Sequence, residues 1–306
     1  MNLLAAMRHR DCPVCGQEAS TASLFLRRSF DETRLTKASF ASRKTPEFMS
    51  YQLVKCERCA TVFANEAPDA SVLANAYHEA DYDTAEEAEF AARAYRKSLE
   101  PFLRSLPRRG LALEIGTGTG VFLSHLRQLG FREQVGIEPS PAAIAAATND
   151  VRSCIRQGIF RGDEFPAGSV SLICCFQTLE HISDPRGFVR AAFEMLEPGG
   201  VIALVTHDYT ASVNRILGAR SPIIDIEHLQ LFCTASLRHL VSAAGYEVQD
   251  IKPIRNVYPL SYWTRLLPVP VSIKRAALGV TKTARLADIP IGLNVGNLLT
   301  VARKPM

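Results

Sequence analysis

The chain has 306 residues, of which 47% are hydrophobic and 22% are charged, and its formal net charge is +4. These fractions are typical of a soluble globular protein. The apolar run near the N-terminus is too short for a secretory signal, and no run of 18 uncharged apolar residues follows it, which argues against a secreted or membrane-spanning chain. We therefore expect a cytoplasmic protein whose eight cysteines are thiols or metal ligands.

The first predicted domain, residues 1–68, contains two Cys-x-x-Cys pairs, Cys12 with Cys15 and Cys56 with Cys59. Each pair suits a tight turn that points two thiolates at one ion, and two such turns complete a tetrahedral site. A redox-active pair would need only one such motif, so the pattern favours a structural Zn²⁺ ion. Zinc would also supply folding energy to a short segment with few large apolar groups. The segment between the pairs holds a hydrophobic run at Leu24–Leu26, and short strands are expected at Met49–Val54 and Val62–Phe63.

Residues 69–110 form a predicted helical connector, with one helix over Thr84–Leu103, and we expect it to pack over a ligand. From residue 111 to residue 306 strands and helices alternate, which is the pattern of a parallel, doubly wound α/β sheet. The seven predicted strands are Leu111–Ile115, Gln134–Ile137, Arg152–Ile155, Val170–Phe176, Val201–Thr206, Tyr246–Ile251 and Leu298–Ala302. The remaining cysteines, Cys154, Cys174, Cys175 and Cys233, are in apolar contexts and are expected in the core.

The first strand of this domain runs into three glycines spaced by two, in the segment Leu-Glu-Ile-Gly-Thr-Gly-Thr-Gly from Leu113 to Gly120. Glycine permits positive φ and lacks the Cβ that would keep a ligand away from the backbone. The dinucleotide fingerprint requires its third glycine one position later. The turn therefore suits a nucleoside better than a pyrophosphate.

The second strand leads to Glu138, eighteen residues after Gly120. A carboxylate there can accept hydrogen bonds from both ribose hydroxyls of an adenosine, as in other doubly wound nucleotide-binding folds. The glycine turn and this acid together resemble the S-adenosylmethionine site of class I methyltransferases. That resemblance implies a Rossmann-like, seven-stranded sheet whose last strand is inserted antiparallel. The cofactor contacts it implies are Glu114, Gly116, Thr117, Gly118, Gly120, Glu138, Pro139 and Gly158.

Two positions depart from that family. Ser171 stands near the start of the fourth strand, where the family usually has an acid, and we interpret this as a structural variation. The segment Gln157–Phe160 lacks the acid that often contacts adenine. Backbone groups of Gly158 and Ile159, or the side chain of Asp163, are the candidate substitutes.

Phe176-Gln-Thr-Leu-Glu-His181 follows the fourth strand, where a doubly wound sheet opens its ligand crevice. With the continuation to Pro185, it resembles the motif of a bacterial group that includes ubiquinone-pathway O-methyltransferases. The resemblance places Gln177 at the methionine end of the cofactor. His181 is the first candidate for a general base, because histidine titrates near neutrality. The alternative is a histidine at a helix start that only braces the pocket.

Two further histidines are candidate bases. His207 lies at the tip of the fifth strand, where Asp208 could orient it; alternatively both only close a wet loop. His228, beside Glu227, lies where acceptor-facing residues of this group are found, although a histidine next to apolar residues is also commonly structural.

A basic, aromatic insertion at about residues 255–294 separates the last two strands. From Lys252 to Met306 there are nine Lys or Arg residues and one acid, a net +8, so the remainder of the chain carries −4. Arg265, Lys274 and Arg275, near Tyr262 and Trp263, could hold an anionic acceptor or contact a membrane surface. The alternative is a solvated helical cover for the sheet.

Taken whole, the chain resembles a bacterial class I methyltransferase with a four-cysteine zinc module, of the small-molecule and glycan group related to sugar C-methyltransferases. Those sugar enzymes have a further domain after the predicted seventh strand that this sequence does not show, so we do not expect their deoxysugar substrate to carry over directly. The resemblance implies methyl transfer from S-adenosylmethionine to a small molecule, a sugar, or a glycan- or lipid-linked acceptor. The alternatives are a ribosomal-RNA methyltransferase, against which the acidic main body argues, and a non-catalytic cofactor-binding module. The sequence does not predict an oligomeric state.

Overall fold

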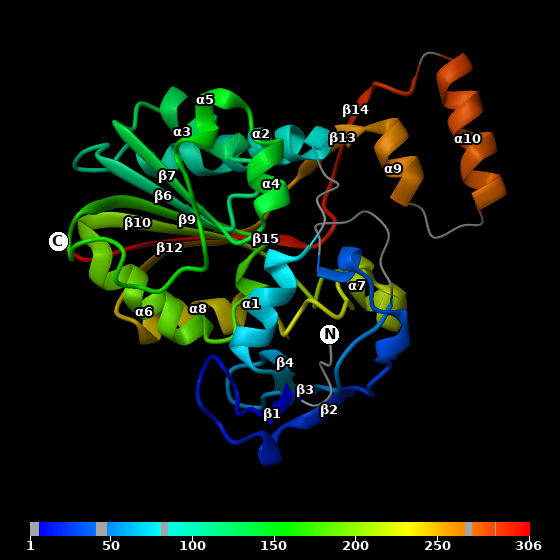
Figure 1. Cartoon of the computed structure of the whole chain (residues 1–306), viewed down its shortest axis with the longest axis horizontal. Coiled ribbons are helices and arrows are strands. Elements are labelled where there is room, and N and C mark those ends of the chain that lie inside the picture. The colour runs from blue at the N-terminus through cyan, green and yellow to red at the C-terminus, as the bar shows by residue number, and fades with distance from the viewer. Residues whose placement is uncertain (1–5, 41–47, 81–84, 267–270, 285) are drawn as a thin grey trace.

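The computed structural model describes residues 6–40, 48–80, 85–266, 271–284 and 286–306. Its centre is a seven-stranded sheet in the order β12-β15-β10-β9-β6-β7-β8 (Figure 1). The strands are β6 (Leu111–Ile115), β7 (Glu133–Glu138), β8 (Ile155–Gln157), β9 (Val170–Phe176), β10 (Leu196–His207), β12 (Glu247–Pro253) and β15 (Asn297–Arg303). The predicted doubly wound α/β fold is confirmed.

The strand directions determine where a ligand can bind. β6 pairs in parallel with both β7 and β9, whereas β15 is inserted antiparallel between β10 and β12. From β6 the chain first builds outward through β7 and β8, and then returns to add β9 on the other side of β6. A doubly wound sheet opens its ligand crevice at the carboxyl ends of the strands where this reversal occurs.

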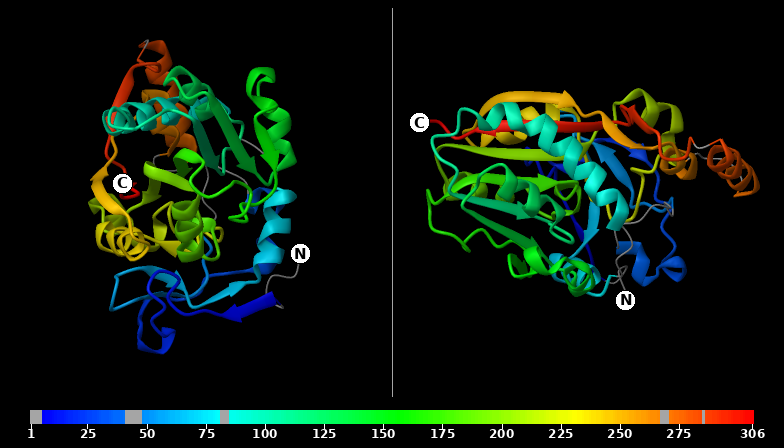
Figure 2. Two further views of the ribbon diagram at one scale, coloured as in Figure 1. Left: turned by 90° about the vertical axis from the view of Figure 1, so that its left-hand side faces the viewer. Right: turned by 90° about the horizontal axis from the view of Figure 1, so that it is seen from above.

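Helices cover both faces of the sheet (Figures 1 and 2). Strand residues alternate between the faces, so Leu172 and Cys174 pack with α2 and α3, whereas Ile173 and Cys175 pack with α6 and α8. Burial of both faces explains why β9 is apolar almost throughout. The helices of this domain are α2 (Ala85–Leu103), α3 (Val121–Gln128), α4 (Pro141–Ala146), α5 (Asn149–Arg152), α6 (Pro185–Met195), α7 (Ser212–Leu217) and α8 (Thr234–Ala243), with 3₁₀ turns η5 (Leu179–His181) and η6 (Gly218–Arg220).

The N-terminal module shares a sheet with the rest of the chain. Gln230 and Leu231, which form β11, pair with Phe63 and Val62 of β4, and this makes a four-stranded sheet in the order β11-β4-β3-β2. Cys12 and Cys56 belong to the same buried cluster as residues of the central sheet. The elements of the module and connector are β1 (Met7–His9), η2 (Ala19–Thr21), β2 (Ser23–Leu26), η3 (Glu32–Arg34), η4 (Lys37–Phe40), β3 (Leu53–Lys55), β4 (Val62–Ala64), β5 (Glu66–Pro68) and α1 (Ala70–His78).

Two predicted strands differ from the structure: the one expected at Met49–Val54 begins only at Leu53, and the one expected at Arg152–Ile155 was misplaced. Arg152 ends the short helix α5, and the third strand of the sheet, β8, begins only at Ile155. The polar run before it stabilises the helical turn locally: Thr148 Oγ1 donates to the Asp150 carboxylate, and the Arg152 guanidinium donates to the carbonyl oxygen of Ala147. Helix α2 agrees with the predicted connector helix, except that Thr84 is outside the described residues.

The insertion between β12 and β15 forms β13 (Asn256–Pro259), α9 (Leu260–Leu266), α10 (Val271–Thr283) and β14 (Pro290–Leu293). β13 and β14 pair with each other in an antiparallel ribbon. Among the described residues, no helix combines the length and apolarity that a membrane crossing requires.

Candidate functional site

The glycine turn after β6 brings bare backbone to the sheet crevice. Gly116 has φ 71° and Gly118 has φ 56°, a left-handed conformation that glycine adopts without strain. A Cβ on Gly116 would clash with Thr178 Oγ1, whereas a Cβ on Gly118 would have no atom within 4 Å. Gly116 therefore permits close packing against the loop after β9, and Gly118 leaves an open space in which a ligand can contact the backbone.

Two buried carboxylates flank this turn. Glu138 Oε2 accepts a hydrogen bond from the amide nitrogen of Gly118 at 2.8 Å, and its Oε1 accepts one from the amide nitrogen of Ser140 at 2.9 Å. Burial raises the pKa of Glu138, although both amides act against that rise. Burial also raises the pKa of Glu114 to about 8, opposed by a hydrogen bond from Thr117 and assisted by the nearby charge of Glu138. The site thus holds two acids whose ionised forms a cationic ligand would favour.

A cavity of about 1610 Å³ extends from this turn to His181, His207 and His228. Typical ligand pockets have about 300–1,000 Å³, so this one has room for two ligands side by side. Most of the predicted cofactor residues line it, namely Glu114, Gly116, Thr117, Gly118, Glu138, Pro139, Gly158 and Gln177. Helices α1 and α2 contribute to the lining through Tyr77 and Tyr95.

Gly120 differs from the other predicted cofactor residues. A Cβ there would contact Ile155, Leu123 and Val151, which belong to the packed interior, and Gly120 does not line the cavity. With φ 72° it serves as the N-cap of α3. Gly120 therefore turns the chain into that helix, and its predicted contact with a cofactor stays a prediction.

The two departures from the family pattern have local explanations. Ser171 is fully buried and its Oγ accepts a hydrogen bond from the amide nitrogen of Gly110, so it braces the chain entering β6. Of the candidate substitutes for the missing acid after β8, Gly158 and Ile159 line the cavity, whereas Asp163 is exposed.

The three candidate histidines lie together on the wall of the cavity beyond Gln177. The ring centroids of His181 and His228 are 4.9 Å apart, and those of His207 and His228 are 5.2 Å apart. Ligand atoms of His181, Glu227 and His228 all lie within 4.8 Å of one another. An acceptor hydroxyl could therefore reach more than one of these groups.

Backbone carbonyls determine the tautomers of two of these rings. His181 Nδ1 lies 3.0 Å from the carbonyl oxygen of Glu227, and His228 Nδ1 lies 2.9 Å from that of Ile223. A carbonyl only accepts, so each Nδ1 carries a proton, and in the neutral tautomer Nε2 is the nitrogen that can accept another.

His207 is oriented by the side-chain amide of Asn297. The predicted orienting acid, Asp208, makes other hydrogen bonds. His207 Nδ1 lies 2.9 Å from Asn297 Oδ1, whereas the Asp208 carboxylate accepts from the amide and hydroxyl of Thr210. Burial lowers the pKa of His207 to about 4, so the ring is neutral near pH 7. Asp208 stabilises its own turn.

Sequence reasoning missed three groups that support these histidines. The hydroxyl of Tyr77 on α1 lies 3.1 Å from His181 Nδ1, and Asn297 begins the last strand. Glu180 is fully buried, and its Oε1 accepts from the amide nitrogen of His207 at 2.6 Å. Burial raises the pKa of Glu180 to about 7. Glu180 has a local signal, since it precedes His181 in the same motif, but the contacts of Tyr77 and Asn297 depend on tertiary packing.

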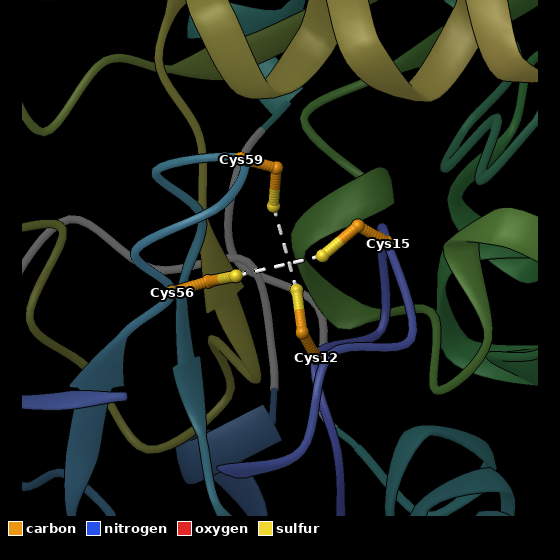
Figure 3. Close-up of side chains that lie close together, drawn as sticks. All are labelled: Cys12, Cys15, Cys56 and Cys59. Carbon is orange, nitrogen blue, oxygen red and sulfur yellow. Dashed lines mark hydrogen bonds between the residues drawn. The ribbon is translucent and has the colours of Figure 1, made fainter. Parts of the chain in front are cut away.

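The four predicted zinc ligands converge from two matching turns (Figure 3). The sulfur atoms of Cys12 and Cys59 are 3.5 Å apart, as are those of Cys15 and Cys56, and all four lie within 4.8 Å of one another. A tetrahedral ion with Zn–S bonds of about 2.3 Å requires sulfur separations of about 3.8 Å. A hydrogen bond from Cys59 lowers the pKa of Cys12 to about 5, so one thiol ionises readily. The donor set and spacing therefore fit zinc.

The cysteine module also contacts the loops that carry the histidines. The Arg10 guanidinium donates to the carbonyl oxygens of Ser183 and Leu229 and to Gln230 Oε1. Gln230 in turn donates to the carbonyl oxygen of Leu179. The hydroxyl of Tyr209 donates to the carbonyl oxygen of Ala60 in the second cysteine turn. The module therefore supports the loops that carry the three histidines of the cavity wall.

Comparison with known proteins is consistent with this geometry. A family model described as a methyltransferase domain matches residues 88–251, more than half of the chain. A probable S-adenosylmethionine-dependent methyltransferase of Mycolicibacterium smegmatis is 31% identical over 142 residues, which cover 45% of this chain and 52% of that relative. A ubiquinone biosynthesis O-methyltransferase of Psychrobacter arcticus is 26% identical over 167 residues, covering 49% and 65%. This chain thus spans about half to two thirds of the length of these relatives.

Among solved structures, a putative methyltransferase of Bacillus halodurans aligns with a TM-score of 0.48 and 15% identity. The alignment covers 69% of this chain and all of that one.

Proposed function

Since this chain belongs to the methyltransferase-domain family, we propose that it transfers a methyl group from S-adenosylmethionine to a small molecule, a sugar, or a glycan- or lipid-linked acceptor. The observation that carries this proposal is the pairing of Glu138 with the open backbone of Gly118 at the crevice where the strand order reverses. A carboxylate next to bare backbone is what an adenosine ribose requires.

The donor-binding residues follow from this placement. Glu138 would accept hydrogen bonds from the ribose hydroxyls, and the backbone of Gly158 and Ile159 would hold the adenine. Glu114 and Gln177 would hold the methionine end, where an ionised Glu114 would stabilise a cationic ligand. The bound donor supplies an electrophilic methyl group on a sulfonium, and the chain aligns the acceptor with it.

On the acceptor side, the cluster of His181, His207 and His228 provides the base. An acceptor hydroxyl must lose a proton as it takes the methyl group, and a neutral imidazole Nε2 can accept that proton. His228 is buried, and its Nδ1–H is held by the carbonyl oxygen of Ile223, so its Nε2 is held in one orientation. His228 is therefore the first choice for the base, with His181 beside it and His207 as the neutral third member.

The four cysteines are proposed to hold one structural Zn²⁺ ion. A Cys₄ site is closed to substrate and contributes its binding energy to folding. The zinc module would act on the reaction only indirectly, because Arg10 and β4 hold the loops that carry the histidines in place.

The relatives named as ubiquinone biosynthesis O-methyltransferases favour an oxygen acceptor over a carbon one, and the kinship with sugar C-methyltransferases remains a proposal. The predicted division into residues 1–68, 69–110 and 111–306 likewise remains a proposal, with the first part contributing to the cavity wall of the last.

Isothermal titration calorimetry with S-adenosylhomocysteine tests the donor site. Wild-type protein should bind one equivalent, and Glu138→Ala should weaken binding at least about 100-fold, because two hydrogen bonds to a charged acceptor are lost. Glu133→Ala, at an exposed position of the same strand, is the matched control and should bind normally. Equal affinity in the two variants would refute the proposed role of Glu138.

A further inference from the structure

The insertion between β12 and β15 is a protruding arm. We name residues 255–294 the C-terminal arm; it contains β13, α9, α10 and β14. In Figures 1 and 2 its two helices extend from the body at the end of the sheet opposite the C-terminus. The side chain of Arg265, one of the three basic residues singled out in this segment, is outside the described residues.

The arm exposes apolar side chains out of proportion to its length. It contains six of the twelve large hydrophobic side chains that are exposed in the described part of the protein. These six are Val257, Ile273, Val280, Leu286, Ile289 and Leu293. Ile273 and Val280 are 55% and 69% exposed and lie seven residues apart on α10, so they point to the same side of that helix. A concentrated exposed apolar surface marks a docking site.

The positive charge of the arm indicates that its docking partner is anionic. Residues 255–294 contain six Lys or Arg residues and one acid, Asp288, which gives a net +5. Three of the basic residues, Lys274, Arg275 and Lys282, are on α10, and none of them forms an ion pair with another described residue. Exposed apolar side chains on a short cationic helix are typical of a segment that lies in the interface of an anionic bilayer.

The arm also reaches the cavity. Tyr258, Tyr262, Trp263 and Lys274 line it together with the glycine turn and the histidines. Trp263 Nε1 donates to the carbonyl oxygen of Ile291 at 2.8 Å, which ties α9 to β14. Tyrosine and tryptophan are the residues that prefer the boundary between lipid and water.

We propose that the C-terminal arm docks on an anionic phospholipid bilayer and so places the cavity next to an acceptor anchored in that bilayer. Helix α10 has 13 residues, fewer than the roughly 20 needed to cross a membrane, so it lies along the surface with Ile273 and Val280 inserted. This inference rests on the proposed methyl transfer and names its acceptor class as amphiphilic, with a head group in the cavity and an apolar anchor outside it.

The test is co-sedimentation of the full chain with vesicles. Wild-type protein should bind vesicles of equal parts phosphatidylcholine and phosphatidylglycerol, and should bind pure phosphatidylcholine much more weakly. Arg275→Gln with Lys282→Gln should reduce the partition coefficient roughly 25-fold, since each basic residue near the surface contributes about fivefold. Ile273→Ser with Val280→Ser should reduce it by about tenfold or more.

The matched control carries Met306→Ser and Arg238→Glu, which remove an exposed apolar group and an exposed charge away from the arm. It should bind vesicles like the wild type. Absence of wild-type binding to anionic vesicles, or equal binding by all variants, overturns the inference, as does salt-dependent RNA binding without vesicle binding. Titration of each variant with S-adenosylmethionine is done in parallel. Normal donor binding without vesicle binding refutes only the arm, whereas absent donor binding refutes the proposed function.

Discussion

Arg10 is the residue whose removal should best reveal that the cysteine module supports the acceptor side of the cavity. Its guanidinium makes hydrogen bonds of 2.7 and 2.8 Å to Gln230 and Ser183, and a third of 3.2 Å to the carbonyl oxygen of Leu229. Burial lowers its pKa to about 10, so it stays charged near pH 7. Hydrogen bonds to a charged group contribute about 1.5–3 kcal/mol each, and because one guanidinium makes all three, their sum of about 5–9 kcal/mol is an upper limit. Removing a charged group that is itself costly to bury recovers part of this.

Arg10→Ala should therefore lower the free energy of unfolding by about 2–4 kcal/mol in urea titrations monitored by circular dichroism. Arg10→Lys should be intermediate, because a single ammonium cannot reproduce the fork of donors. Arg8→Ala is the matched control: Arg8 is exposed and pairs with Asp69 at 3.3 Å, so its loss should cost at most about 1 kcal/mol.

Arg10→Ala should also affect donor binding and methyl transfer differently. Ser183 and Leu229 are next to the segments that carry His181 and His228, whereas the donor turn follows β6. Arg10→Ala should leave donor affinity within about twofold and reduce methyl transfer. If Arg10→Ala unfolds like Arg8→Ala, or if it weakens donor binding as strongly as transfer, the reasoning is refuted.

Other predictions concern the acids, the histidines and the metal. Because the pKa of Glu114 is raised to about 8, its carboxylate forms as pH increases toward that value. Affinity for S-adenosylmethionine should then rise by up to about tenfold per pH unit below pH 8 and level off above it, and Glu114→Gln should abolish this rise in calorimetry. His228→Ala should reduce transfer by about 10²–10⁴-fold without changing donor affinity; a variant that transfers normally would assign the base to His181 or His207. Chelation should release one zinc per chain, seen with a colorimetric indicator, and Cys56→Ser should contain substoichiometric zinc and melt at lower temperature; a metal-free protein with unchanged melting would argue against the site.

Much of the fold follows from local pattern. The apolar run of β9, the glycine turn and the spacing of the two cysteine pairs each have a short-range signal, and β9 was predicted with its observed bounds. The strand expected at Arg152–Ile155 failed because Thr148 and Asp150 favour a helical turn there.

The assembled acceptor side depends on contacts between distant segments. Pairing of Phe63 with Gln230 joins residues 167 positions apart, and Tyr77 meets His181 across 104 positions. No local periodicity indicates such contacts, so the connector was predicted to cover the ligand without naming Tyr77. Spacing alone also does not show that Gly120 packs against Leu123, Val151 and Ile155, because those contacts form only in the fold.

The most direct test is a crystal structure with S-adenosylhomocysteine bound. The ribose hydroxyls should lie within hydrogen-bonding distance of Glu138, the adenine beside Gly158 and the amino acid end between Glu114 and Gln177. A nucleoside bound elsewhere, or one whose ribose does not reach Glu138, would contradict the proposed function.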